Sequence, residues 1–191
     1  LFASTRQIYG KPQYLPVDEE HLLDPVDVNG INKVAAEHYH ALYSKVYSLD
    51  TVSLRLTNTY GPRMRVKDAR QTFLGIWIKK IIENQPFEVW GGEQIRDYNY
   101  IDDVTEAMLL AISKENRQHT VYNLGHHETL NLQESAEQMI EVAEMGSFEV
   151  IKYPEERRKI DIGDYYSDYE RFKLEMNWTP KTSFKEGMGG P

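Results

Sequence analysis

The sequence predicts an α/β fold in which parallel strands are joined through helices. Two short apolar runs, residues 1–5 and 52–56, stand on either side of a long helical pattern that begins after Asp27. Strand, loop, helix and strand in this order form a crossover unit, which normally joins parallel strands. Because the carboxyl ends of parallel strands meet at one edge of a sheet, we expect any ligand to bind there.

The helical pattern after Asp27 is the longest in the chain. Pro25 ends the preceding segment, and Lys33 projects from the first turn toward the end of the first strand, where Thr5 lies. Apolar or small residues recur with a period of about 3.6, at Ile31, Val34, Ala35, Tyr39, Leu42, Tyr43 and Val46. We expect core packing to account for most of this face.

The remaining elements follow from the same patterns. Residues 11–25 are rich in turn formers, and we interpret their acidic run, residues 18–20, as solvated surface. Paired aspartates at residues 102–103 are expected to cap a helix rather than to bind a metal. We predict helices over 71–84, 102–113, 131–145 and 171–176, and strands over 87–90, 121–124 and 148–153.

Composition limits the partners of the chain. With 30 acidic and 22 basic residues among 191, the net charge of −8 argues against binding to nucleic acid or to a membrane surface. No apolar run approaches the ~18 residues of a membrane span. The chain has no cysteine, and the pair His126–His127 lacks the spacing of a metal site. We expect no metal and a cytoplasmic location.

Four motifs occur in a distinctive order: residues 4–10 (STRQIYG), 29–33 (NGINK), 55–62 (RLTNTYGP) and 96–104 (RDYNYIDDV). With these motifs the chain resembles extended short-chain dehydrogenase/reductases, and most closely the NAD-dependent nucleotide-sugar epimerases and dehydratases of the UDP-glucose 4-epimerase type. The resemblance implies that residues 1–62 are the last part of a doubly wound, Rossmann-like sheet. Residues 63–191 would be a small, mainly helical α/β domain that binds the substrate.

Members of this family begin with a strand and a G-x-x-G-x-x-G turn, whose bare backbone approaches the pyrophosphate of NAD. None of the 12 glycines of the chain forms such a turn. We therefore interpret the sequence as the carboxy-terminal portion of a family member. NAD is the implied cofactor, and most of its site lies outside this sequence.

The resemblance assigns catalytic positions to Thr5, Asn29 and Lys33. A Ser or Thr at the position of Thr5 hydrogen-bonds the sugar oxygen that is oxidised. In the family pattern Tyr-x-x-x-Lys, the two side chains share one helix face. The lysine binds the nicotinamide ribose and lowers the pKa of the tyrosine toward neutrality. For Lys33, the alternative is an ordinary exposed lysine paired with Glu37 one turn later.

The tyrosine position holds Asn29, whose amide has no proton to exchange near neutral pH. Three explanations remain open at this point: a weakened or silent enzyme, a stand-in proton donor such as Tyr60 or Tyr98, or an engineered change.

The two residues after Thr5 bear on the reaction type. Family members that dehydrate hexoses carry an Asp-Glu pair there, and those that decarboxylate glucuronic acid also carry a carboxylate. This chain has Arg6 and Gln7, neither of which can act as a carboxylic acid. Epimerase-like chemistry is therefore the expectation.

The resemblance also assigns binding of a nucleotide-diphosphate sugar. Asn58 and Arg96 would contact the diphosphate, since a guanidinium binds two oxygens at once. Arg158 and Asp161 match the spacing of an arginine and an aspartate that hold the nucleotide. The segment around Trp90 would meet the base. These substrate residues are Asn58, Trp90, Arg96, Arg158 and Asp161.

The sequence thus indicates a fragment of an NAD-dependent nucleotide-sugar epimerase or related enzyme. The alternative is a nucleotide-sugar-binding protein without catalysis or with an altered mechanism, because the substrate residues are more complete than the acid/base pair. The resemblance further implies a homodimer that forms through the helix beginning near Asn29.

Overall fold

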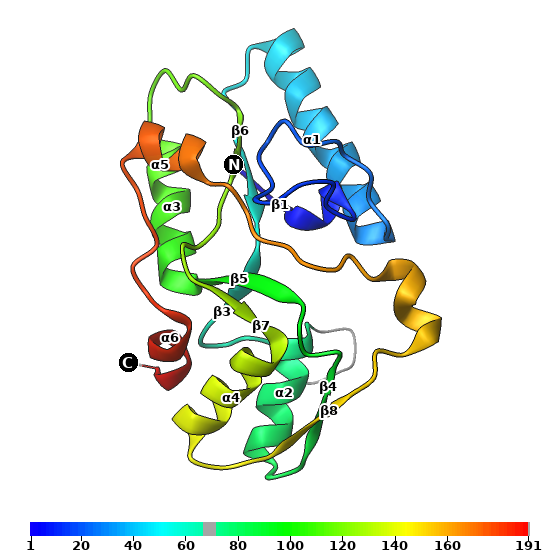
Figure 1. Ribbon diagram of the computed structural model, residues 1–191. Helices are drawn as coiled ribbons and strands as arrows, with labels where there is room; N and C mark the ends of the chain where they lie inside the picture. Colours follow the sequence, from blue (N-terminus) through cyan, green and yellow to red (C-terminus); the bar gives the residue numbers. More distant parts are fainter. Residues whose placement is uncertain (67–71, 191) are drawn as a thin grey trace.

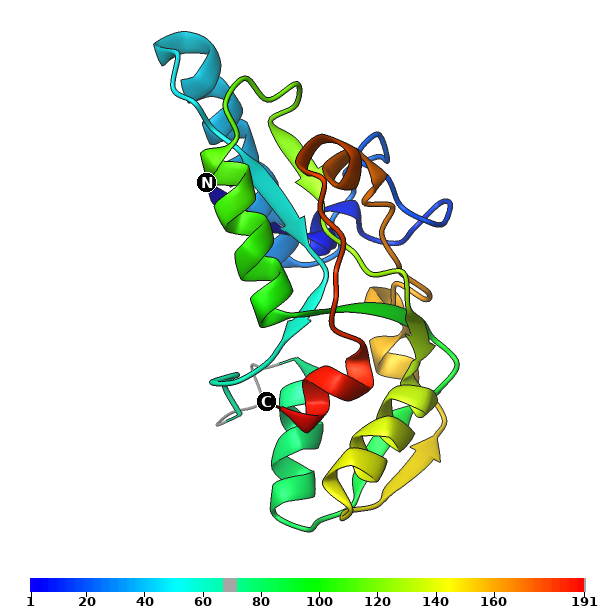
Figure 2. The ribbon, with the colours of Figure 1, turned by 90° about the vertical axis from the view of Figure 1, so that its left-hand side faces the viewer.

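The computed structural model describes residues 1–66 and 72–190, and the backbone alone for 158–160. The chain forms two bodies, which lie one above the other in Figure 1. The upper body contains the predicted catalytic residues Thr5, Asn29 and Lys33. The lower body contains most of the predicted substrate residues. The long axis through both bodies is also visible in Figure 2.

A parallel sheet of order β1-β2-β6 forms the centre of the upper body. Its register pairs Thr5 with Leu56 and Arg55 with Asn123, so the carboxyl ends of all three strands meet at one edge. The helices α1 and α3 lie on either side of this sheet (Figure 1). The elements of this body are β1 (Phe2–Thr5), the short 3-10 helix η1 (Arg6–Tyr9), α1 (Val28–Tyr47), β2 (Ser53–Leu56), α3 (Ile101–Ser113), β6 (Val121–Asn123) and α5 (Glu170–Met176).

Two smaller sheets form the lower body, one of order β3-β5-β7 and one that pairs β4 with β8. Helices α2 and α4 pack beside them and contact each other. The elements are β3 (Asn58–Tyr60), α2 (Phe73–Ile82), β4 (Phe87–Trp90), β5 (Ile95–Tyr100), β7 (Thr129–Asn131), α4 (Leu132–Ala143), β8 (Phe148–Ile151), the 3-10 helix η2 (Glu155–Ile160) and α6 (Phe184–Gly189).

The chain passes between the two bodies more than once. β6, which comes after the predicted division at residue 62, adds to the sheet of β1 and β2. Buried apolar residues of α3 and α5, such as Val104 and Phe172, pack against Leu54 of that sheet. Segments from both sides of residue 62 therefore build the upper body. The division into residues 1–62 and 63–191 stays a prediction about function.

The exposed face of α1 contradicts one prediction from sequence. Only Gly30 and Glu37 of this helix are buried. The predicted core face is instead open to solvent, with exposed fractions of 65% for Tyr39, 51% for Leu42, 47% for Tyr43 and 57% for Val46. The apolar period is present in α1, but it describes a surface that this chain does not itself cover. In the described part of the chain, no helix is long and apolar enough to cross a membrane.

Candidate functional site

Three polar side chains converge where β1 ends and α1 begins. The Thr5 hydroxyl donates to Gln7 Oε1 at 3.3 Å, and the Asn29 amide donates to the same oxygen. The Gln7 amide in turn donates to Asp27 Oδ2 at 2.9 Å. The structure therefore brings together Thr5 and Asn29, as the motifs predict, and adds Gln7 between them. Sequence reasoning considered Gln7 only as a missing carboxylate.

Local geometry explains why this helix begins so close to the strand end. The Asp27 carboxylate caps α1 by accepting from Gly30 N at 2.7 Å. A Cβ on Gly30 would lie 2.6 Å from Gln7 O and 2.7 Å from Pro25 Cβ. Only glycine fits this contact, which brings Asn29 and Gln7 within hydrogen-bonding reach.

Lys33 lies one turn after Asn29, on the same face of α1. Its ammonium donates to Ala3 O at 2.6 Å and lies 4.8 Å from the centroid of the Phe2 ring. An ammonium carries three N–H donors, so two remain for a ligand. The alternative of a lysine paired with Glu37 is wrong, because Glu37 binds elsewhere.

A buried ion pair holds Glu37. Its two carboxylate oxygens accept from the Arg55 guanidinium of β2 at 3.1 and 2.7 Å. Arg55 also donates to the Tyr9 hydroxyl at 2.8 Å, which donates to Asn123 Oδ1 at 2.6 Å. Burial raises the pKa of Tyr9 well above its ordinary value, so its hydroxyl stays protonated as a donor. This chain of contacts, which the sequence did not suggest, links α1, β2, η1 and β6.

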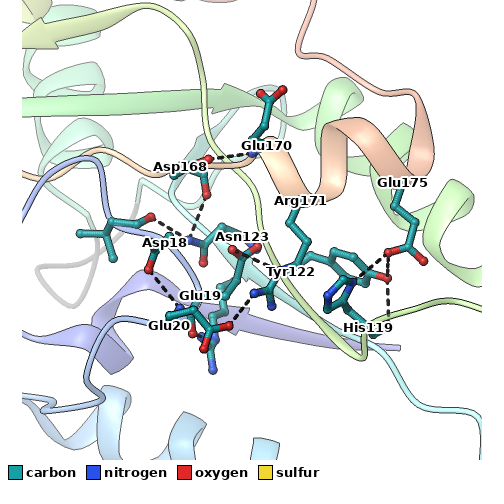
Figure 3. A network of polar contacts seen from close by, with 12 residues as sticks. Asp18, Glu19, Glu20, His119, Tyr122, Asn123, Asp168, Glu170, Arg171 and Glu175 are labelled. Atoms are coloured by element: carbon teal, nitrogen blue, oxygen red, sulfur yellow. Dashed lines mark hydrogen bonds and ion pairs between the residues drawn. The ribbon is translucent and has the colours of Figure 1, made fainter.

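A second polar network fixes the loop over residues 11–25 to the same edge (Figure 3). Asn123 N donates to Glu19 Oε1 at 2.7 Å, while the Asn123 amide donates to Val17 O and Asp168 O. Arg171 forms ion pairs with Glu19 and with Glu20. The Glu19 side chain is only 5% exposed, and burial raises its pKa. The interpretation of this acidic run as solvated surface is therefore wrong for Glu19.

A cavity of about 590 Å³ lies in the lower body, between α2, β4 and η2. Trp90, Arg96 and Asp161 line it, together with Tyr153 and Arg157. The Trp90 indole packs edge-on against Tyr153, with 6.1 Å between the ring centroids. Three of the five predicted substrate residues thus share one cavity. The sequence did not identify Tyr153 and Arg157 as site residues, because only the fold brings them to the cavity.

Arg96 is the charged side chain that is most deeply buried at this cavity, with an exposed fraction of 8%. Its guanidinium donates to Ile95 O at 2.7 Å and to Gly163 O at 2.5 Å. Burial and then the charge of Arg6 lower the pKa of Arg96 to about 10, still far enough above neutrality to keep it charged. A desolvated guanidinium bound only to neutral carbonyls is suited to bind an anion.

The other two predicted substrate residues have different outcomes. The Asn58 amide donates to Asp97 O at 3.2 Å, and Asn58 is not among the residues that line the cavity. The Arg158 side chain lies outside the described residues, so its role stays a prediction. Asp161 lines the cavity, and its carboxylate accepts from Gly163 N at 3.0 Å.

The two candidate stand-ins for the missing tyrosine have hydroxyls that are bound to other groups. The Tyr60 hydroxyl donates to Ser183 O and Phe184 O, and the Tyr98 hydroxyl bonds Ser135 Oγ at 2.9 Å. Both rings belong to the apolar core of the lower body. Burial raises the pKa of Tyr98 to about 12 and raises that of Tyr60 as well. These contacts and raised pKa values argue against a role of either hydroxyl as the proton donor, and the stand-in stays a prediction.

This arrangement can be compared with known proteins. The model of the NAD dependent epimerase/dehydratase family matches residues 1–125. The chain belongs to this family. A putative UDP-glucose 4-epimerase of Methanocaldococcus jannaschii is 32% identical over 199 residues, which cover 98% of the chain and 60% of that relative.

Solved structures give the same assignment. UDP-glucose 4-epimerase of Thermotoga maritima, in complex with UDP-glucose, is 29% identical, with a TM-score of 0.85 over 98% of this chain and 60% of that one. The UDP-glucose 4-epimerase of Thermus thermophilus, in complex with NAD, is 28% identical, with a TM-score of 0.83 and the same coverages, 98% and 60%. The predicted α/β, Rossmann-like fold class is confirmed. The chain spans about 60% of the length of these relatives.

Truncation of the buried carboxylate tests the chain of contacts that holds α1. In Glu37→Ala the Arg55 guanidinium stays buried without its partner, so we expect the free energy of unfolding to fall by about 3–5 kcal/mol. Urea denaturation followed by circular dichroism measures the change. Glu137→Ala, at an exposed position of α4, serves as the control and should change stability by only about 0.5 kcal/mol. A loss below about 1 kcal/mol for Glu37→Ala would contradict this account.

Proposed function

We propose that this chain is the substrate-binding part of an NAD-dependent nucleotide-sugar epimerase or a closely related nucleotide-sugar enzyme. The observation that carries the proposal is the shared cavity of Trp90, Arg96 and Asp161, which combines an aromatic ring, a buried guanidinium and a carboxylate. These groups suit the base, the diphosphate and the ribose of a nucleotide, respectively. The complexes of the relatives with UDP-glucose and with NAD support the proposal.

The residues of this chain also fit one end of the implied cofactor. Lys33 donates to Ala3 O, two residues before Thr5 in β1, and keeps two ammonium donors that can hold a ribose. When bound, NAD would supply reversible hydride transfer with the sugar. Thr5 would orient the sugar hydroxyl by a hydrogen bond, while Arg96 would hold the diphosphate at a fixed distance from it.

Asn29 occupies the sequence position of the family tyrosine but cannot perform its chemistry. Its amide donates to Gln7 and cannot exchange a proton near neutral pH. We propose that Asn29 weakens or silences proton transfer, because the hydroxyls of Tyr60 and Tyr98 are bound elsewhere. The second candidate function is therefore a nucleotide-sugar-binding protein without catalysis.

Binding of UDP-glucose to the chain tests the proposed substrate site. We expect calorimetric titration to show binding, and Arg96→Ala to weaken the affinity by about 10-fold or more, because a charged hydrogen bond to the diphosphate is lost. Lys114→Ala removes an exposed cation beyond the carboxyl end of α3 and should leave the affinity unchanged. Equal affinities for wild type and Arg96→Ala, both folded by circular dichroism, would refute the role of Arg96.

Restoring the tyrosine separates the two candidate functions. In a protein that joins this chain to a glycine-rich NAD-binding half, we expect Asn29→Tyr to raise epimerase turnover by roughly 10²–10⁴-fold, the usual contribution of a positioned acid/base group. The assay follows interconversion of UDP-glucose and UDP-galactose. Asn32→Tyr, on the exposed side of the same helix, is the control. Unchanged turnover would point to another proton donor, and no turnover in any variant would favour the binding protein.

We also propose that the chain forms a homodimer through α1. The apolar side chains on its exposed face, which include Tyr39, Leu42 and Val46, are more than half exposed, and such a face is typical of an association surface.

The oligomeric state gives the test of this surface. We expect Leu42→Glu to convert a dimer into a monomer in analytical ultracentrifugation, since a carboxylate would be buried in the interface. Leu174→Glu, at a position of α5 that is 74% exposed, should leave the dimer intact. A wild-type chain that sediments as a monomer at high micromolar concentration would exclude the proposal.

A further inference from the structure

Arg6 is a cation that the proposed function does not use. It opens η1 directly after Thr5, and it is half-buried. Among the described residues its guanidinium forms no hydrogen bond and no ion pair; its one close contact is the ring of Tyr165, whose centroid lies 5.0 Å from Cζ. None of its guanidinium nitrogens is among the fully buried side-chain atoms without a partner, so its N–H donors are open to solvent and available to a ligand.

Asp97, whose charge acts on Arg6 more strongly than that of Asp27, does not pair with it. Asp97 is fully buried, but its oxygens accept from the Thr57 hydroxyl and from Ser167 N at 3.0 Å. Burial lowers the pKa of Arg6, and the fields of Tyr165 and Asp97 oppose this only in part. Asp97 therefore attracts Arg6 from a distance without occupying its N–H donors.

Arg6 and Arg96 contact the same segment of chain. Arg96 donates to Gly163 O, and Arg6 stacks on Tyr165, two residues further on, which is at most roughly 7 Å of chain. The charge of Arg6 is one of the causes that lower the pKa of Arg96. Two guanidiniums whose charges act on each other favour an anion between or beside them. Arg6 is the one next to Thr5, and Arg96 is the one at the nucleotide cavity.

We propose that Arg6 is a specificity-determining residue that binds a carboxylate carried on the sugar, so that the preferred substrate is a nucleotide-linked sugar acid. This inference rests on the proposed function, because it takes Thr5 to contact the reacting sugar and Arg96 to contact the diphosphate. A carboxylate on that sugar lies within reach of the long side chain that follows Thr5, and the planar fork of a guanidinium matches its two oxygens. A neutral hexose would leave Arg6 without a partner.

Calorimetric titration of the 191-residue chain with UDP, UDP-glucose and UDP-glucuronate tests the proposal. The two sugars differ only in the carboxylate at C6. We expect wild type to bind UDP-glucuronate about 10-fold or more tightly than UDP-glucose. Arg6→Gln should bring this ratio to about 1 by weakening UDP-glucuronate alone, and Arg6→Lys, which keeps the charge but not the fork, should retain part of the preference. Lys114→Ala is the control and should keep the full ratio.

Three outcomes would overturn the proposal. A wild-type ratio of about 1 or below would show that no acid is preferred, while binding of UDP-glucose would leave the proposed function intact. An equal loss for UDP and both sugars in Arg6→Gln would assign Arg6 to the diphosphate instead. Failure of wild type to bind any of the three ligands would remove the proposed function together with this inference. The wild-type ratio and Arg6→Lys decide the question even if Arg6→Gln does not fold.

Discussion

The buried ion pair between Glu37 and Arg55 determines how the functional edge is assembled. The pair joins α1 to β2, and through Tyr9 and Asn123 it extends to η1 and β6. A buried pair contributes little net stability over an apolar replacement, but loss of either partner leaves the other charge buried and unpaired. In this arrangement Asn29 donates to Gln7 and Lys33 donates to Ala3 O, while Glu37 is bound to Arg55 of β2.

The candidate site holds two arginines in a chain that is acidic overall. Overall the net charge is −8, yet the residues between β1 and the cavity include the half-buried Arg6 and the buried Arg96. Both guanidiniums are partly desolvated, and neither forms an ion pair among the described residues. Because a local field in a low-dielectric site outweighs distant surface charges, an acidic protein of this kind can still select anionic ligands.

Position 29, at the edge of the sheet, has a defined place in the structure but lacks a side chain that can transfer a proton. Gly30 and Asp27 build the same close helix start that a tyrosine at position 29 would need. Asn29 fills that place and hydrogen-bonds Gln7, but an amide supplies no proton. The cavity with Trp90, Arg96 and Asp161 does not depend on this residue, which is why a binding function and a silenced enzyme fit the same fold.

The sequence by itself determined the crossover of β1, α1 and β2 and the helices α2 to α5, because periodicity and short motifs are local signals; it did not predict β3, β5, β7 or α6. It did not determine what covers each element. Burial of Glu19 depends on Asn123, which lies 104 residues away, and the exposed face of α1 has the same period as a buried one. Only the tertiary structure placed Arg6 over Tyr165 and set Glu37 on Arg55. Such contacts depend on how distant segments pack, and no local pattern in the chain records them.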